Sequence, residues 1–358
     1  MKILIYNWKD IKHPGAGGAE VLTYEVAKRW IKKGHEVTWF SPAFEGCEKE
    51  EEIDGINIVR DGDKFSVYKK AKDYYINRFS KEGFDVVIDE TNTRPFFAKD
   101  FVKDAKVVFF IHQLAREWWF YETKFPMNFA GYFIENFWLK RYANYPTVTV
   151  SESTKQDLVQ LGFKNVKIIS EGISFKPFNR IPEKNMKPTI CFLGRLNKGK
   201  RVELALKAFE IVKEEIEDAE FWVIGDGYMK EKLAKRFKNA RFFGKVSESE
   251  KIKLLSLSWL QVNPSVREGW GINVIEGNAC GTPCIAFDVP GLRDSIKHNQ
   301  TGILVKEDGN IQKLAEAIMM VLKDKKLRQK LSKNALEYSK QFSWDKSADE
   351  FLDIIESL

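Results

Sequence analysis

The sequence predicts two Rossmann-like, doubly wound α/β domains followed by C-terminal helices. Its 358 residues exceed the roughly 250–300 residues at which a single hydrophobic core stops growing. Short apolar runs, rich in β-branched and aromatic residues, alternate with longer amphipathic runs, and this alternation stops once and then restarts. Strand followed by helix in regular succession implies parallel sheets, which bind ligands at the carboxyl ends of their strands.

The first domain is expected over residues 1–172. The segment "AEVLTYEVAKRWIKKG" carries Leu22, Val26 and Trp30 one helical turn apart and stops at Gly34, as an amphipathic helix does. Around it, buried strands are predicted by short runs that are apolar on both faces: "KILIYNW", "HEVTWF", "DVVIDE", "KVVFFIH" and "TVTVS".

The pattern restarts after a linker expected at residues 173–188, where prolines are frequent and hydrophobic periodicity is missing. The second domain is expected over 189–340, with strands at "TICFLGR", "EFWVIG", "ARFFG" and "WLQVNPS". A C-terminal helix is expected over 341–358, and its packing back on the first domain is left open. Two such domains would face each other across a ligand-binding cleft.

The composition favours a globular protein of a reducing compartment. The net charge of +7 suits anionic partners, although its charges are interspersed as on solvated helix faces. The four cysteines form no zinc-site pattern, and no recognition helix for nucleic acid is apparent. The first residues turn polar too soon for a signal peptide, and no apolar run approaches the roughly 20 residues of a membrane span. A cytoplasmic location is therefore expected.

Two segments have sequence features that are typical of phosphate-binding sites. In "KDIKHPGAGGAEVL", the glycines Gly15, Gly17 and Gly18 precede a helix start, which attracts phosphate; a simple flexible loop remains an equal alternative. In "FLGRLNKGKRVELA", Arg195 follows a strand and Lys200 precedes a helix. Cations there oppose the helix dipole, and an anionic ligand would resolve the conflict, whereas solvated surface cations are the alternative.

A third segment, "NPSVREGWGINVIEGNACGTPC", spaces two carboxylates eight positions apart. Glu268 lies in the loop after a buried strand, and Gly269 and Gly271 lead into a helix expected from about Ile272 to Ala279. Glu268 can accept hydrogen bonds from hydroxyl groups beside a bound phosphate, while Glu276 lies one turn further along the helix. The alternative is a capping carboxylate with one solvated helix glutamate.

Together these segments resemble the family-4 glycosyltransferases, which are retaining enzymes of the GT-B fold, and the likeness covers nearly the whole chain. It is carried by "EGWGINVIE" with "ACGTP", by the G-R-L-x-x-x-K pattern, by "VIGDG" and by "GGAE". The family pattern is broken at Arg201, where glycine is common, at Glu171 and Ser174 near the linker, and at Trp270, where phenylalanine is common. Arg201 suggests a tighter or more basic phosphate loop.

The resemblance implies a UDP-, GDP- or ADP-sugar donor, with no cofactor and no required metal. Arg195 and Lys200 would neutralise the diphosphate, Glu268 would hold the donor sugar, and His112 would contact the transferred sugar from the first domain. A hydroxyl acceptor, whether a glycan, a lipid-linked or a small molecule, would lie against the first domain. The remaining donor-binding positions that the resemblance implies are Gly17, Gly18, Gly194, Gly244, Val246, Gly269, Trp270, Gly271 and Glu276.

Two other functions stay open on the same fold: a nucleotide-sugar epimerase and a non-catalytic nucleotide-sugar-binding module. A separate question is raised by the aromatic segment "REWWFYETKFPMNFAGYFIENFWLKRYANY". Phe129, Phe133 and Phe137 share one helical stripe, and Ile134, Trp138 and Tyr142 share another. Packing in the core or against a domain is the favoured interpretation. A helix that rests on an anionic membrane surface is the alternative, because aromatic and basic residues alternate there.

Overall fold

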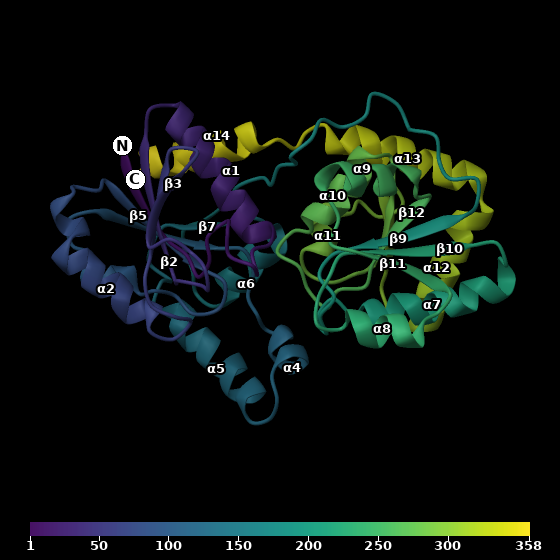
Figure 1. Cartoon of the computed structure of the whole chain (residues 1–358), viewed down its shortest axis with the longest axis horizontal. Coiled ribbons are helices and arrows are strands. Elements are labelled where there is room, and N and C mark those ends of the chain that lie inside the picture. The colour runs from purple at the N-terminus through teal and green to yellow at the C-terminus, as the bar shows by residue number, and fades with distance from the viewer. The chain divides into compact units, whose positions relative to one another are not determined.

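The computed structural model describes residues 1–358 and divides into two compact units. Unit 1 comprises Met1–Arg116, Phe129–Gly172 and Ser343–Leu358, and unit 2 comprises Glu117–Asn128 and Ile173–Phe342. Each unit is a sheet flanked by helices (Figure 1), so that the expected α/β class is confirmed. The structure differs from the expected continuous first domain at Glu117–Asn128, which belongs to unit 2 because its side chains contact that unit.

Unit 1 contains an eight-stranded sheet in the order β3-β4-β2-β1-β5-β6-β7-β8, parallel except for the β3–β4 pair. Its strands are β1 (Lys2–Tyr6), β2 (Glu36–Ser41), β3 (Glu50–Ile53), β4 (Ile56–Arg60), β5 (Val86–Thr91), β6 (Lys106–Ile111), β7 (Thr147–Thr149) and β8 (Val166–Ile168). Every strand predicted for this half is present. The missed strands are β3, β4 and β8, at the two ends of the sheet. The edge strands β3 and β8 are largely exposed and carry polar residues, whereas β4 is mostly buried.

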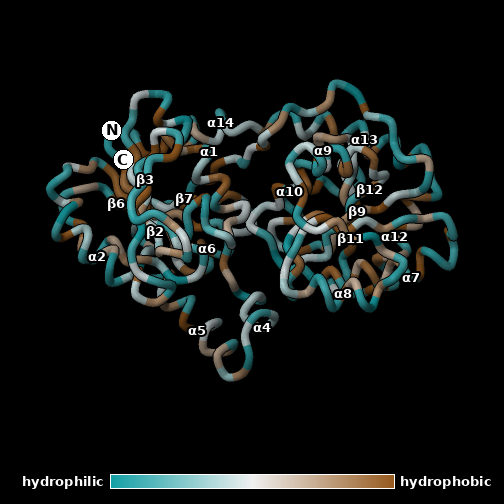
Figure 2. The backbone as a smooth tube through the Cα atoms, viewed as in Figure 1, coloured by the Kyte–Doolittle hydropathy of each residue, from teal (hydrophilic) through white to brown (hydrophobic).

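The helices of unit 1 cover this sheet. They are α1 (Gly18–Lys32), α2 (Val67–Asn77), α3 (Ala98–Phe101), α5 (Met127–Lys140), α6 (Glu152–Gln160) and α14 (Trp344–Glu356), with a 3-10 turn at Phe79–Lys81. Leu22, Val26 and Trp30 of α1 are buried, as their spacing predicts. Hydrophobic stretches of the backbone gather along the inner strands, and hydrophilic ones follow the outer loops (Figure 2).

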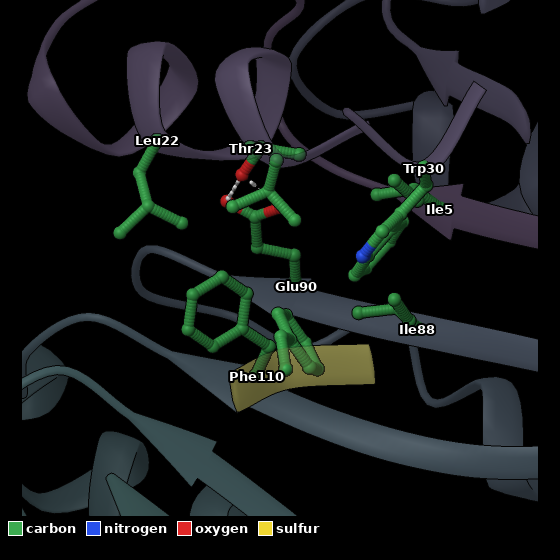
Figure 3. A pocket seen from close by; sticks show the side chains of 9 residues that line it. Ile5, Leu22, Thr23, Trp30, Ile88, Glu90 and Phe110 are labelled. Atoms are coloured by element: carbon green, nitrogen blue, oxygen red, sulfur yellow. Dashed lines mark hydrogen bonds between the residues drawn. The ribbon is translucent and has the colours of Figure 1, made fainter. Parts of the chain in front are cut away.

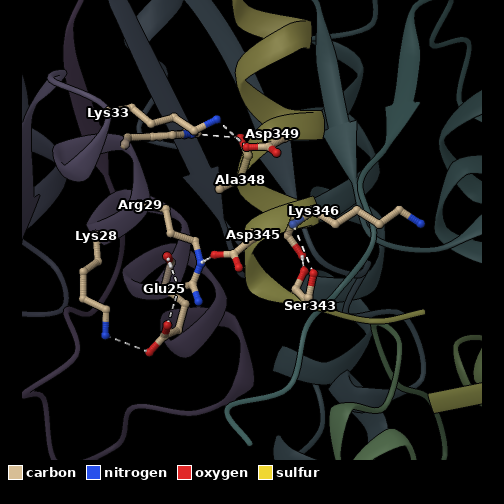
Figure 4. A network of polar contacts seen from close by, with 11 residues as sticks. Glu25, Lys28, Arg29, Lys33, Ser343, Asp345, Lys346, Ala348 and Asp349 are labelled. Atoms are coloured by element: carbon tan, nitrogen blue, oxygen red, sulfur yellow. Dashed lines mark hydrogen bonds and ion pairs between the residues drawn. The ribbon is translucent and has the colours of Figure 1, made fainter. Parts of the chain in front are cut away.

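The helix α14 packs on α1, although more than 300 residues separate them in the chain. The Trp30 indole N–H donates to the carbonyl of Ala348 at 3.0 Å, and the Trp30 and Phe351 rings meet edge to face at 5.3 Å. Around this contact, Arg29 pairs with Asp345 and Lys33 pairs with Asp349 (Figure 4). The last helix of the chain is thus part of the core of unit 1.

Unit 2 contains a six-stranded parallel sheet in the order β11-β10-β9-β12-β13-β14. Its strands are β9 (Thr189–Leu193), β10 (Glu220–Ile224), β11 (Ala240–Gly244), β12 (Leu260–Asn263), β13 (Cys284–Phe287) and β14 (Gly302–Val305). Its helices are α4 (Trp118–Glu122), α7 (Val202–Glu215), α8 (Lys230–Arg236), α9 (Glu248–Leu257), α10 (Ile272–Ala279), α11 (Leu292–Ser295), α12 (Ile311–Lys323) and α13 (Lys325–Ser339).

The expected linker, 173–188, contains no helix or strand, but it is fixed along unit 2. The Phe178 N–H donates to the carbonyl of Ala279 at 3.0 Å. Lys184 is half-buried, and its ammonium donates to the carbonyl of Cys280 at 3.0 Å and to the hydroxyl of Thr282 at 2.8 Å. Burial lowers the pKa of Lys184 to about 8. The linker therefore packs as part of the unit rather than as a free tether.

The aromatic segment places most of its first stripe in solvent. Phe129, Phe133 and Phe137 of α5 are 50%, 66% and 67% exposed. The helix instead buries Gly131, Glu135 and Leu139, and the Glu135 carboxylate accepts hydrogen bonds from the backbone of the loop before α4. For this stripe, packing in the core is wrong, because the buried face lies two positions further along. In the second stripe, Tyr142 is buried in the core of unit 1, as expected. No helix in the chain has both the length and the apolar character that crossing a bilayer requires.

Candidate functional site

The loop between β9 and α7 contains both cations singled out in the sequence. Arg195 follows β9 at an exposed position, and Lys200 precedes α7. The Lys200 ammonium contacts both carboxylate oxygens of Glu268, at 2.5 Å and 2.6 Å. The Ser265 hydroxyl also donates to Glu268, at 2.7 Å. The structure thus brings two of the predicted site residues, Lys200 and Glu268, into one ion pair at the carboxyl ends of β9 and β12.

This ion pair is mostly shielded from water, since the two side chains are 15% and 11% exposed. Without a ligand the lysine charge is balanced by the glutamate. A bound anion would compete for the lysine and free the carboxylate to accept hydroxyl hydrogen bonds. The pair therefore joins an anion-binding group to a hydroxyl-binding group in a single unit.

Of the two expectations for Arg201, a tighter or a more basic loop, the second is wrong and the contacts of its side chain favour the first. The Arg201 side chain is buried; it donates to the carbonyls of Pro264 and Ser265 and pairs with Asp308. It anchors the loop to the end of β12 instead of facing a ligand. Its φ of 49° lies in the left-handed region, which explains why a glycine would fit this position without strain.

The backbone beside Gly194 is crowded by neighbouring strand ends. A Cβ atom on Gly225 would lie 2.0 Å from the Gly194 carbonyl, and one on Gly227 would lie 2.5 Å from the Leu196 carbonyl. Both glycines have positive φ. The G-D-G element is thus needed so that the β10 end can approach the loop after β9. Its Asp226 pairs with Lys230 at 2.7 Å.

The helix α10 begins and ends where the sequence predicts. Gly271 caps it with a φ of 103°, and Gly269 and Trp270 precede it. The Trp270 ring packs on Phe342 at 5.7 Å, and its indole nitrogen is buried without a hydrogen-bond partner. Trp270 therefore acts as a wall of the core behind the loop.

Glu276 lies inside α10 and is nearly buried, at 8% exposure. Its carboxylate accepts a hydrogen bond from the Lys251 ammonium at 2.5 Å. Burial raises the pKa of Glu276, and Lys251 partly opposes that effect. No local pattern indicates Lys251, because it lies on α9, 25 positions earlier. Of the predicted positions for the base, Gly244 ends β11 with a φ of 73°, and Val246 follows it at a half-buried position.

In unit 1, His112 follows β6 and is buried. Its Nε2 lies 2.9 Å from an oxygen of Glu90 at the end of β5. The Thr23 hydroxyl of α1 bonds the same carboxylate at 2.8 Å, as Figure 3 shows, beside a cavity of about 10 Å³. Burial raises the pKa of Glu90, whereas His112 lowers it. Glu90 was not among the predicted site residues, yet it fixes the orientation of the histidine ring.

In unit 1, a side chain of α1 accepts a hydrogen bond from the glycine loop that precedes this helix. Gly17 caps α1, and its N–H donates to the Glu20 carboxylate at 2.6 Å; Gly18 is the first helical residue. Glu20 is 2% exposed, and Lys9 approaches it at 3.7 Å. One of the N–H groups expected to face a phosphate is therefore already used. No group of three or more His, Cys, Asp and Glu side chains in the chain has the geometry of a metal site.

The two halves of the chain match two family models. The model described as "Glycosyltransferase Family 4" matches residues 16–176, and the model "Glycosyl transferases group 1" matches residues 175–338. The chain belongs to glycosyltransferase family 4. The residues of the Lys200–Glu268 ion pair lie within the second match.

Similar proteins agree with this family membership. A glycosyltransferase of Methanocaldococcus jannaschii is 31% identical over 160 residues, which span 43% of this chain and 44% of that protein. The match therefore covers less than two thirds of the relative's length. The sucrose-phosphate synthase of Thermosynechococcus elongatus superposes with a TM-score of 0.82 at 18% identity, covering 99% and 98% of the two chains. HepE of Anabaena, solved with UDP and glucose, has a TM-score of 0.73 at 16% identity over the full length of both chains. These structures confirm the GT-B fold.

Proposed function

We propose that this glycosyltransferase moves a sugar from a nucleoside-diphosphate sugar to a hydroxyl acceptor, with retention of configuration and without a metal ion. The observation that carries the proposal is the ion pair of Lys200 with Glu268, which holds an anion-binding group against a hydroxyl-binding group. In a nucleoside-diphosphate sugar, a charged phosphate and a hydroxylated sugar ring are joined at one bond, so the donor has a partner for each of these two groups.

The transfer breaks the bond between the anomeric carbon and the diphosphate oxygen, and the electron pair leaves with the diphosphate. Lys200 and Arg195 are proposed to stabilise this growing negative charge, as fixed cations gain strength while the charge develops. They would supply the positive charge that a metal ion provides in other transferases. The acceptor hydroxyl forms the new bond to the same carbon, and its proton passes to the departing phosphate.

The other donor contacts follow from the backbone around α10. The N–H groups after Glu268, at Gly269, Trp270 and Gly271, are proposed to face the sugar and phosphate, because this glycine-rich loop leads directly into the start of α10. Glu276 is proposed to bind the ribose hydroxyls once it exchanges part of its contact with Lys251. In unit 1, Glu90 holds the His112 ring that is proposed to contact the transferred sugar.

The decisive test is turnover with a defined donor. The purified protein is screened by thermal shift against UDP, GDP, ADP and their sugars, since a ligand at 100 times its Kd stabilises by about 2.7 kcal/mol. UDP is the first probe because HepE was solved with it. Release of free nucleoside diphosphate that depends on an added acceptor, and that persists with EDTA, supports the proposal. Binding without release would favour a binding module, and a changed donor sugar without transfer would favour an epimerase.

A membrane surface is proposed as the place where the acceptor is met, at the cytoplasmic face. Large apolar side chains are exposed along α5 in unit 1: Phe129, Phe133, Ile134 and Phe137. The exposed Lys140 ends this helix, and such a combination suits an interface with anionic lipid. This arrangement favours a lipid-linked acceptor over a free glycan or a small molecule.

Flotation with vesicles of anionic and of zwitterionic lipid tests this location. The wild type is expected to float with anionic vesicles at low salt, and the double variant Phe133→Ser/Phe137→Ser is expected to stay at the bottom. Because both rings are about two-thirds exposed, the variant should keep the wild-type Tm. A wild type that stays at the bottom with anionic lipid at low salt refutes the membrane location while leaving the transfer reaction untouched.

A further inference from the structure

A short segment of the chain covers the loop that carries Lys200. Residues 117–128, here called the strap, leave unit 1 after Arg116 and return to it at Phe129, yet they pack on unit 2. The strap is held at its start by Glu117, whose carboxylate pairs with the buried Arg267 at 2.7 Å. The Trp118 indole N–H donates to the carbonyl of the same arginine at 3.3 Å.

The Trp118 ring lies directly on the phosphate loop. A Cβ atom added to Gly199 would come within 2.1–2.6 Å of three ring carbons, so that only glycine permits this contact. The ring centre is 5.8 Å from the Lys200 ammonium, close enough for a cation–π attraction. One face of the lysine is thus covered by the strap, while its other contact is Glu268.

Glu122, at the end of α4, places a carboxylate on this loop. One of its oxygens accepts the Gly199 N–H at 3.0 Å, and the other accepts the Tyr228 hydroxyl at 2.7 Å. The neighbouring N–H groups are satisfied by residues outside the strap: that of Lys200 donates to Asn197, and that of Lys198 donates to Tyr228. The Gly199 N–H is therefore the loop donor that an acidic side chain of the strap holds.

We propose that Glu122 is an affinity-determining residue of the donor site, whose carboxylate occupies the place of a donor phosphate oxygen on the Gly199 N–H. The inference rests on the proposed function, because it takes Lys200 to be the partner of the diphosphate. A phosphate beside Lys200 meets a second negative charge at Glu122, so that donor binding must displace the strap. The strap sets the donor concentration at which the site becomes occupied.

The test compares Glu122→Gln with the wild type in calorimetric titrations with UDP, GDP and ADP. Glutamine keeps the shape and an acceptor oxygen but loses the charge, and hydrogen bonds to a charged group are roughly twice as strong as neutral ones. The variant is expected to bind the preferred nucleotide about three- to tenfold more tightly, with a smaller difference at high salt. Glu210→Gln is the matched control, because it removes the same charge from an exposed position on α7 and should bind as the wild type does.

A second measurement follows the strap itself. Lys124 is exposed, and trypsin cleavage after it is expected to accelerate when the nucleotide is added, because the strap leaves the loop. Nucleotide binding that is lost in Lys200→Ala but is equal or weaker in Glu122→Gln overturns this inference alone. Absence of binding by the wild type for all three nucleotides refutes the proposed function, and the inference with it.

Discussion

Replacing Lys200 by alanine is expected to change both the turnover rate and the free energy of unfolding, and the two effects can be measured separately. In the structure the ammonium contacts both oxygens of Glu268, at 2.5 Å and 2.6 Å, and the two side chains are 15% and 11% exposed. Loss of one preorganised group that stabilises developing charge typically lowers the rate by roughly 100- to 1000-fold, which corresponds to about 2.7–4 kcal/mol. We expect this loss in kcat for Lys200→Ala.

The same substitution leaves Glu268 without its cation. Breaking a fully buried pair costs about 3–5 kcal/mol, and exposed pairs are worth about 0–1 kcal/mol. Partial exposure and the remaining bond from Ser265 place the expected loss in the free energy of unfolding between these values, at about 1–3 kcal/mol. The double variant Lys200→Ala/Glu268→Gln should recover most of this stability, because an amide needs no counter-charge, and its turnover should stay low.

The assay is acceptor-dependent release of nucleoside diphosphate, run beside urea denaturation of each variant. Lys198→Ala is the matched control, since Lys198 is an exposed lysine of the same loop. Near-wild-type turnover in Lys200→Ala would refute the assigned role. Recovery of turnover together with stability in the double variant would show that Lys200→Ala had lost its rate through unfolding, and the role of Lys200 in the chemistry would then be refuted as well.

Three further changes test packing in the chain, one at the site and two away from it. Burial lowers the pKa of Lys184 to about 8, so the folded state holds fewer protons than the unfolded chain between pH 8 and 10.5. In urea denaturation, the free energy of unfolding of the wild type should therefore rise by about 3 kcal/mol across that range relative to Lys184→Met. Parallel curves of unfolding free energy against pH would contradict this. Gly199→Ala should expel the Trp118 ring and speed trypsin cleavage of the strap, with Trp118→Ala restoring the Tm of the double variant. In Gly172→Ala the new methyl group would lie 2.4 Å from the Trp344 backbone nitrogen, so a fall in Tm is expected, and an unchanged Tm would show that α14 has freedom to move.

The strands and helices that carry the site were predictable because their signals are local. Most inner strands read as short apolar runs, although β4 and β13, which also lie inside their sheets, were not predicted. The helix α10 was predicted with its observed limits, since Gly271 marks its start. The pairing of Lys200 with Glu268 could not be predicted, although both residues were singled out. Their contact depends on β9 and β12 lying side by side in the sheet, which spacing alone does not reveal.

Other parts of the site escaped prediction for the same reason. Glu90 and Lys251 act through contacts 22 and 25 positions away along the chain, and Glu122 reaches Gly199 across 77 positions. The aromatic stripe of α5 misled because a phenylalanine every fourth residue indicates an apolar face without indicating what covers it. The buried face of that helix contains Glu135, although hydropathy assigns glutamate to the solvent-exposed face.

Because of the contact between α14 and α1, unit 1 can finish folding only after the end of the chain has been synthesised. Unit 1 begins with the first residue of the chain but includes Ser343–Leu358. While a ribosome is still adding the second half, Trp30 lacks the helix that covers it, and its apolar surface stays open to chaperones or to premature association. A fragment ending near residue 172 would carry the same bare face, and supplying the peptide 343–358 in trans should close it.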